Sequence, residues 1–215
     1  MATGMELATF HVRGIAPLLF NNAQTADPNN KITRLIKKIT DKRKKTELDY
    51  QMISELEWLG ALYLSEAPVI LVENKGIQVG GGGAIGIPGY VVEATLRDAA
   101  RKSRNGKTFE ASLMSDGFWP ITYDGPTELE VLIKDERFID IRPAGVQRNK
   151  IMRTRPIFRK WEMVFEVEYD PRDLSHEEVE EALVLAGSKQ GFGDFRPRHG
   201  RFEVFTPEEN GNGSR

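Results

Sequence analysis

The chain has 215 residues, no cysteine and a formal net charge of −2. The absence of cysteine excludes disulfides, zinc–thiolate sites and iron–sulfur clusters, and it is typical of the reducing cytoplasm. The chain has no apolar run of the roughly 20 residues that a membrane helix needs, and its start lacks the layout of a secretory signal. We therefore expect a soluble cytoplasmic protein with no membrane partner and no cofactor.

The first third of the chain predicts a strand, a polar loop and a helix. Residues 7–14 alternate apolar and polar side chains, which indicates a strand. Residues 15–30 contain prolines and paired asparagines and predict a loop. After a short basic stretch, leucines at helical spacing predict a helix over 46–62, with Thr46 and Asp49 as its capping box.

The middle of the chain predicts strands on both sides of a second helix. Residues 69–79 indicate a strand or hairpin arm that ends in the glycine run 80–83. A helix is expected over 89–102, where apolar residues again follow helical spacing. Residues 129–134 (LEVLIK) and 161–169 (WEMVFEVEY) alternate apolar and polar side chains, so both are predicted to be strands.

The C-terminal part predicts a third helix and a last strand. Ser175 and Glu178 form a capping box that opens the helix, and Gly187 is its expected stop. The apolar residues of this helix recur at helical spacing and predict one buried stripe. Residues 201–205 predict the final strand.

Taken together, these elements predict an α+β protein with a ferredoxin-like, RRM-type core. The core order is strand, helix, strand, strand, helix, strand. A long helical insertion at about 15–88 separates the first strand from the first core helix. A basic thumb at about 142–160 lies between the second and third strands. We expect one domain over 1–206 and a disordered tail at 207–215.

Most of the positive charge lies in three segments. Residues 31–45, 142–160 and 189–201 hold 19 of the 30 lysines and arginines, with Asp41 and Asp194 as their only acids. The rest of the chain therefore carries 30 acids against 11 bases. A net charge near zero is thus compatible with one strongly positive surface of the protein. A polyanion responds to the charge of the surface that it contacts.

The segment 189–201 (KQGFGDFRPRHGR) is a glycine-rich basic loop. Such a loop between a helix and an edge strand offers free backbone N–H groups to phosphates. Phe192 and Phe195 are candidates to stack on bases. The alternative is an ordinary connection whose phenylalanines belong to the core.

The other two basic segments predict a projecting hairpin and a basic helix. The segment 142–160 has seven cations and two prolines, and Ile151, Met152 and Phe158 are candidates to insert between bases. The segment 31–45 has eight cations in a short amphipathic stretch. For both segments the alternative is a solvated surface with no ligand.

A glycine cluster and the histidines are the remaining candidates for chemistry. Gly81, Gly83 and Gly86 match G-x-G-x-x-G, but a dinucleotide site needs the third glycine inside a helix, and a Pro-Gly pair interrupts here. A flexible loop or a close passage for a polymer backbone are the alternatives. The three histidines are scattered, and only His199, between two arginines, is placed for acid–base work on a phosphodiester. Asp27 is a weaker candidate, so we predict no catalytic residue and no metal site.

Two stretches resemble one known family. IGIPGYVVEATLRDAARK (85–102) resembles the stretch that opens the first helix of RAMP-superfamily proteins, the RNA-binding backbone subunits of CRISPR effector complexes. GSKQGFGDFRPRHGRFEVF (187–205) resembles their glycine-rich loop and terminal strand. Tyr90 and Val91 stand where those relatives carry small polar residues. The whole chain is also similar to phage and prophage proteins of no assigned activity. The resemblance implies the core, insertion and thumb described above, an RNA partner and copies stacked side by side.

We therefore predict a non-catalytic protein that grips single-stranded nucleic acid by its backbone, with RNA the expected polymer and DNA the alternative. Two other functions stay open: a phage interaction protein that mimics or inhibits a CRISPR or other defence complex, and a metal-independent ribonuclease. The prediction requires all three basic segments to fold onto a common groove. The residues expected at this interface are Lys37, Lys38, Lys42, Arg43, Lys44, Lys45, Arg148, Lys150, Met152, Arg153, Arg155, Lys189, Gly191, Gly193, Phe195, Arg196, Arg198, His199 and Arg201.

Overall fold

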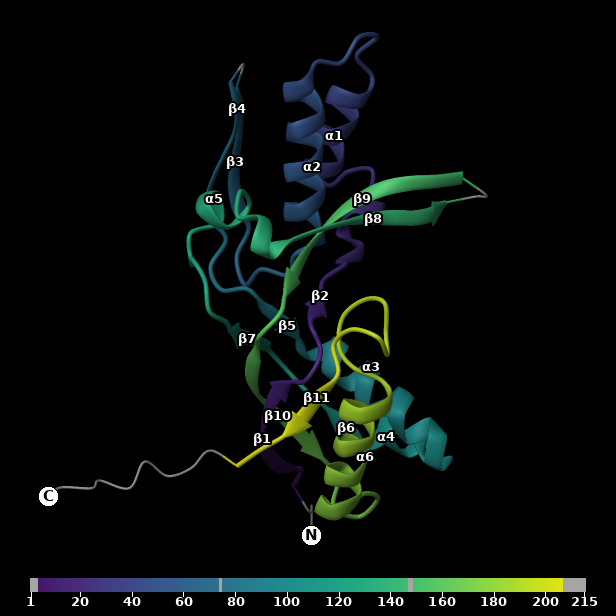
Figure 1. Ribbon diagram of the computed structural model, residues 1–215. Helices are drawn as coiled ribbons and strands as arrows, with labels where there is room; N and C mark the ends of the chain where they lie inside the picture. Colours follow the sequence, from purple (N-terminus) through teal and green to yellow (C-terminus); the bar gives the residue numbers. More distant parts are fainter. Residues whose placement is uncertain (1–3, 74, 147–148, 207–215) are drawn as a thin grey trace, which may run out of the picture.

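The computed structural model describes residues 4–73, 75–146 and 149–206, without the side chains of 144–151. Over these ranges the chain is an α+β protein with antiparallel sheets and six α-helices (Figure 1). No helix in the described part is long and apolar enough to cross a bilayer. The tail expected at 207–215 lies outside the described residues.

The largest sheet has the strand order β11–β1–β10–β7–β5, and β6 also pairs with β10. All of these pairings are antiparallel. The alternation predicted for β1 and β10 is confirmed, because Phe10 lies opposite Phe165 and both side chains are buried. The strands of this sheet are β1 (Glu6–Gly14), β5 (Gly86–Pro88), β6 (Leu113–Met114), β7 (Phe118–Thr122), β10 (Glu162–Tyr169) and β11 (Phe202–Val204).

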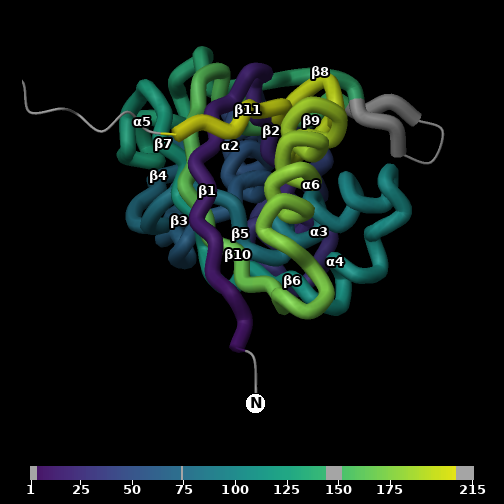
Figure 2. Tube along the Cα trace, turned by 90° about the horizontal axis from the view of Figure 1, so that it is seen from below, coloured from purple at the N-terminus to yellow at the C-terminus, as the bar shows by residue number. Residues whose placement is uncertain are grey.

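Helices α3 (Gly89–Ala100) and α6 (His176–Lys189) pack against each other and cover one face of this sheet (Figure 2). The predicted capping box of Ser175 and Glu178 opens α6. The predicted stop at Gly187 is wrong, since the helix continues for two more residues. A Cβ at Gly187 would lie 2.3 Å from a carbonyl oxygen of β11, so this glycine allows the helix to approach the strand closely.

The predicted insertion contains a pair of helices and a separate hairpin. Helices α1 and α2 pack side by side, and α2 starts at the predicted capping box of Thr46 and Asp49. Strands β3 and β4 pair with each other, so the arm predicted at 69–79 is a hairpin. The elements of the insertion outside the main sheet are β2 (Leu18–Leu19), η1 (Ala23–Ala26), α1 (Lys31–Thr40), α2 (Glu47–Ala61), β3 (Pro68–Glu73) and β4 (Gly76–Gly81).

The basic hairpin predicted at 142–160 is formed by β8 (Ile139–Val146) and β9 (Asn149–Phe158), which project from the rest of the molecule (Figure 1). The C-terminal end of β9 pairs with β2 and makes a second sheet in the order β2–β9–β8. The hairpin also packs on α2, where the hydroxyl oxygens of Ser54 and Thr154 lie 2.8 Å apart. The base of the hairpin is therefore fixed by two neighbouring elements.

The strand predicted at 129–134 is wrong, because α5 (Leu129–Leu132) is a short helix. Leu132 and Ile133 are buried with Leu129, whereas Val131 is exposed. A run with four apolar residues in five positions fits both the two-residue period of a strand and the 3.6-residue period of a helix. Its apparent alternation therefore does not distinguish the two. Strands β6 and β7, which the sequence did not predict, hold the sheet position beside β10. The remaining short helices are η2 (Arg101–Ser103), α4 (Gly106–Ser112) and η3 (Glu136–Phe138).

Candidate nucleic-acid interface

The glycine-rich loop between α6 and β11 folds tightly against the chain around β2. The N–H groups of Asp194 and Gly200 donate to the carbonyls of Leu19 and Pro17, each over 2.8 Å. Inside the loop, the N–H of Phe192 donates to the Gly200 carbonyl over 2.9 Å. The prediction that the loop offers its N–H groups to phosphate is therefore wrong for these three, because contacts within the protein already use them.

Three glycines allow this path. Gly191, Gly193 and Gly200 have φ of +78°, +75° and +74°, which side chains disfavour. A Cβ would lie 1.7 Å from the Phe192 carbonyl oxygen at Gly200, and 2.3 Å from that of Leu19 at Gly193. These glycines therefore serve close packing of the loop, and their predicted contact with a ligand stays a prediction.

The loop and the hairpin meet at Phe195. The guanidinium carbons of Arg142 on β8 and Arg155 on β9 lie 5.2 and 5.3 Å from the centre of the Phe195 ring. Arg155 also lies 3.3 Å from the Asp194 carboxylate and is only 8 % exposed. Each cation–π contact of this kind contributes about 0.5–2 kcal/mol. We call Arg142, Arg155, Asp194 and Phe195 the junction, and it joins two of the three basic segments.

His199 lies beneath the junction, with its ring centre 6.3 Å from that of Phe195. It is only 7 % exposed, and burial, reinforced by Arg142, lowers its pKa, so the ring is neutral at pH 7. Its Nδ1 has no hydrogen-bond partner among the described residues. A buried neutral ring is poorly placed to contact a phosphodiester, which weakens the predicted contact with nucleic acid.

Further exposed cations lie on the glycine-rich loop and at its two ends. Those contributed by the C-terminal loop and the end of α6 are Lys189, Arg196, Arg198 and Arg201. Phe192 is fully buried against Trp161 and the sheet, so its predicted role in stacking on bases is wrong. Phe195 is 41 % exposed, although two guanidinium groups already contact its ring.

The hairpin beyond the junction presents few free cations among its described side chains. Arg153 pairs with Glu57 on α2, and Arg155 is held at the junction. Met152 is 59 % exposed and remains a candidate contact for a base. Phe158 is fully buried, so its predicted insertion between bases is wrong. The predicted contacts of Arg148, Lys150 and Ile151 lie outside the described residues or side chains.

The expectation that all three basic segments share one groove is wrong, because the third segment is not brought to the junction. The loop between α1 and α2 lies at the far end of this helix pair, on the side away from the glycine-rich loop (Figure 1). There Lys42 pairs with the Asp49 carboxylate over 2.6 Å, and Lys45 donates to the Lys42 carbonyl. The other predicted contacts in this segment are exposed: Lys37, Lys38, Arg43 and Lys44.

The glycines at the start of α3 and in the strand before it are also packing residues. A Cβ at Gly86 would lie 2.3 Å from the Trp119 carbonyl oxygen, and one at Gly89 would lie 1.6 Å from that of Ser115. Gly86 lies in β5 and outside a helix, so the G-x-G-x-x-G spacing lacks the geometry of a dinucleotide site. The geometry therefore does not support the glycine cluster 81–86 as a cofactor site.

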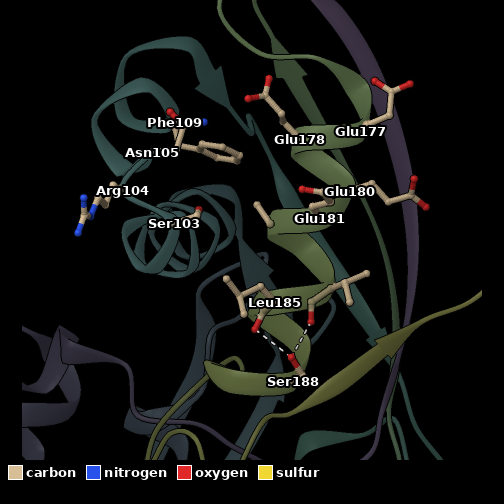
Figure 3. A pocket seen from close by; sticks show the side chains of 12 residues that line it. Ser103, Arg104, Asn105, Phe109, Glu177, Glu178, Glu180, Glu181, Leu185 and Ser188 are labelled. Carbon is tan, nitrogen blue, oxygen red and sulfur yellow. Dashed lines mark hydrogen bonds between the residues drawn. The ribbon is translucent and has the colours of Figure 1, made fainter.

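A cavity of about 1010 Å³ between α6 and the η2–α4 segment has the opposite charge (Figure 3). Four glutamates of α6 lie along one wall, and Arg104 lies on the other. Acidic walls repel a polyanion, so this cavity is unsuitable for a phosphate backbone. The glutamates of the wall are Glu177, Glu178, Glu180 and Glu181.

The sequence matches no known family model and no curated protein.

Sequence reasoning missed several residues around the junction. Arg142 lies in a predicted basic segment, but its contact with Phe195 depends on tertiary structure. Tyr63 and Tyr90 line a cavity beside the loop, although they are far apart in the sequence. One signal was available: Tyr90 is a large aromatic residue at a position where the resembled family has a small polar one.

Proposed function

We propose that the protein binds single-stranded nucleic acid, with RNA the expected polymer, by gripping its phosphate backbone without catalysis. The observation that carries this proposal is the junction, where two arginines of the basic hairpin contact Phe195 and so bring the hairpin and the glycine-rich basic loop together. Arg196, Arg198 and Arg201 extend the charge along the exposed loop. Arginine suits this task because its planar guanidinium donates two parallel hydrogen bonds to one phosphate.

The proposal includes a ferredoxin-like, RAMP-type core. In chain order, β1, α3, the strand position shared by β6 and β7 beside β10, β10 itself, α6 and β11 follow the strand–helix–strand–strand–helix–strand pattern of that fold. The basic hairpin leaves this core between β7 and β10, where the resemblance places a thumb. Both the sequence motifs and the order of the elements support a RAMP-type core. The proposal also includes the assembly of copies side by side along the nucleic-acid strand. Light scattering with and without RNA tests the assembly.

Salt titration is the direct test of the backbone contact. Fluorescence anisotropy of a labelled ~30-nucleotide RNA should show an affinity that falls steeply from low to high salt. Single strands give a slope of about −0.7 in log–log form per contacted phosphate, so five contacts predict about −3.5. An affinity that does not change with salt would contradict the mechanism. The same measurement on DNA of equal sequence tests the choice of polymer.

Two further measurements separate the alternatives. Nucleic acid that co-purifies with the protein, seen as a raised 260/280 nm absorbance ratio, favours the proposal over a protein-interaction role. Incubation of labelled RNA with the wild type in divalent metal or chelator tests for a ribonuclease. The burial of His199 gives the ribonuclease no support.

A further inference from the structure

A small cavity of about 220 Å³ lies beside the junction, between α3, the chain that follows β2 and the glycine-rich loop. Its floor is apolar and consists of Phe20, Ile87, Val91 and Ala94. Ligand pockets for drug-sized molecules or cofactors measure about 300–1,000 Å³. The cavity is therefore suited to a single ring system rather than to a dinucleotide.

Two tyrosines form an aromatic wall of this cavity. The rings of Tyr63 and Tyr90 meet edge to face, with centres 6.4 Å apart and an angle of 75° between their planes. Tyr63 is partly buried, whereas Tyr90 is 60 % exposed. Burial and the neighbouring Tyr90 raise the pKa of Tyr63, so its hydroxyl stays protonated and able to donate. Tyr90 is thus an exposed aromatic ring held in place beside a concave surface.

The rim of the cavity carries groups that form hydrogen bonds. Asn21, Asp194 and Arg196 lie there, from the chain after β2 and from the glycine-rich loop. Asp194 is held by Arg155, which also offsets its negative charge, and by the hydrogen bond from its N–H to the Leu19 carbonyl. The rim therefore presents both donors and acceptors, and its carboxylate lies 3.3 Å from the Arg155 guanidinium.

We infer that this cavity binds one unstacked base of the strand whose phosphates contact the neighbouring arginines, an inference that rests on the proposed function. Single-stranded nucleic acids are recognised by stacking of splayed bases on aromatic side chains and by hydrogen bonds to the base edges. Tyr90 supplies the stacking surface, and Asn21 and Asp194 face the base edge. Arg196 belongs to both sites and links the base to the phosphate that follows it.

The test compares an RNA 20-mer with a strand of equal length that lacks all of its bases, so that no shift in register can place a base in the cavity. Anisotropy titrations are made at one salt concentration with the wild type, with Tyr90→Ala and with Tyr50→Ala. Tyr50 is a matched control, because it is 62 % exposed on α2 and outside the cavity. Alanine in place of a stacking aromatic residue removes the contact with one base. We expect Tyr90→Ala to weaken binding of the complete RNA about tenfold and to change binding of the abasic strand much less.

The outcomes separate this inference from the proposed function. If the wild type binds both strands equally, or if Tyr90→Ala weakens both alike, the base site is wrong and backbone binding stands. If the wild type binds neither strand, both proposals fall. Tyr90→Phe keeps the ring, so it should restore most of the affinity. Equal unfolding midpoints of the variants and the wild type show that the fold is intact.

Discussion

The junction and the loop between α1 and α2 are both rich in cations, but the fold holds them differently. At the junction, Arg142 and Arg155 contact one ring, and backbone hydrogen bonds fix the loop that carries it. Between α1 and α2, Arg43 and Lys44 are simply exposed. Ordering a free lysine or arginine side chain costs up to about 2 kcal/mol. The comparison teaches that two regions with the same basic composition can differ in how many of their cations the fold holds in place.

The largest expected effect concerns the glycines that shape the loop. Gly200→Ala should destabilise the protein by about 3 kcal/mol or more, because the new Cβ meets the Phe192 carbonyl oxygen at a positive φ. Gly81→Ala is the matched control, since Gly81 also has a positive φ but no atom within 4 Å of an added Cβ. It should cost only about 1 kcal/mol. Urea unfolding measures both, and equal losses would contradict the tight packing of the loop.

The next effect concerns the ion pairs of the two regions. Arg155→Met should cost about 2 kcal/mol, because it leaves the Asp194 carboxylate without its partner and removes a contact with Phe195. Lys42→Met at the other basic loop should cost less, since Asp49 keeps its hydrogen bonds from Thr46. Unfolding midpoints in urea compare the two. A larger loss for Lys42→Met would reverse the contrast between the regions.

Binding should distinguish the two regions as well. The double variant Arg196→Gln/Arg198→Gln should weaken RNA binding about tenfold at low salt, because two phosphate contacts are lost. Arg43→Gln/Lys44→Gln removes the same charge from the far end of the helix pair and should change the affinity little. Anisotropy at about 50 mM salt measures both. If the second variant loses as much as the first, long-range attraction rather than the junction explains binding.

The smallest effect is a pH dependence at the junction. The pKa of His199 is lowered in the folded protein, so the unfolded chain binds the proton more readily. The contribution of His199 to stability is therefore complete above the unfolded pKa of about 6.5 and is lost as the pH falls through its folded pKa. His199→Gln should remove part of the loss in urea midpoint between pH 7.5 and 5.5. If the urea midpoint of this variant falls with pH as in the wild type, other groups cause the loss of stability.

Local signals made much of the fold predictable. The capping boxes at Thr46 and Ser175 involve residues three positions apart, so the sequence shows both partners of each contact. The alternation of β10 is clear because one face packs on helices and the other does not. The segment at 129–134 failed because its apolar residues fit two periods and only packing selects one.

The candidate site was less predictable, because it depends on contacts between distant segments. The basic composition of the loop and hairpin is visible in the sequence. The contacts of Arg142 and Arg155 with Phe195, however, join residues about 40 to 53 positions apart. The N–H groups of Asp194 and Gly200 could not be known to be occupied, because their acceptors near β2 lie far away in the chain. Tyr63 and Tyr90 meet for the same reason.

The two-residue strand β2 has a mechanical consequence for recognition. On one side Leu18 and Leu19 pair with β9, and on the other the Leu19 carbonyl accepts the hydrogen bond from Asp194. The β8–β9 hairpin and the glycine-rich loop are therefore both hydrogen-bonded to the same short piece of backbone. Their orientation relative to each other is fixed by it. A nucleic-acid strand that contacts both the hairpin and the loop would bind a preorganised surface. No binding free energy would be lost in aligning the two.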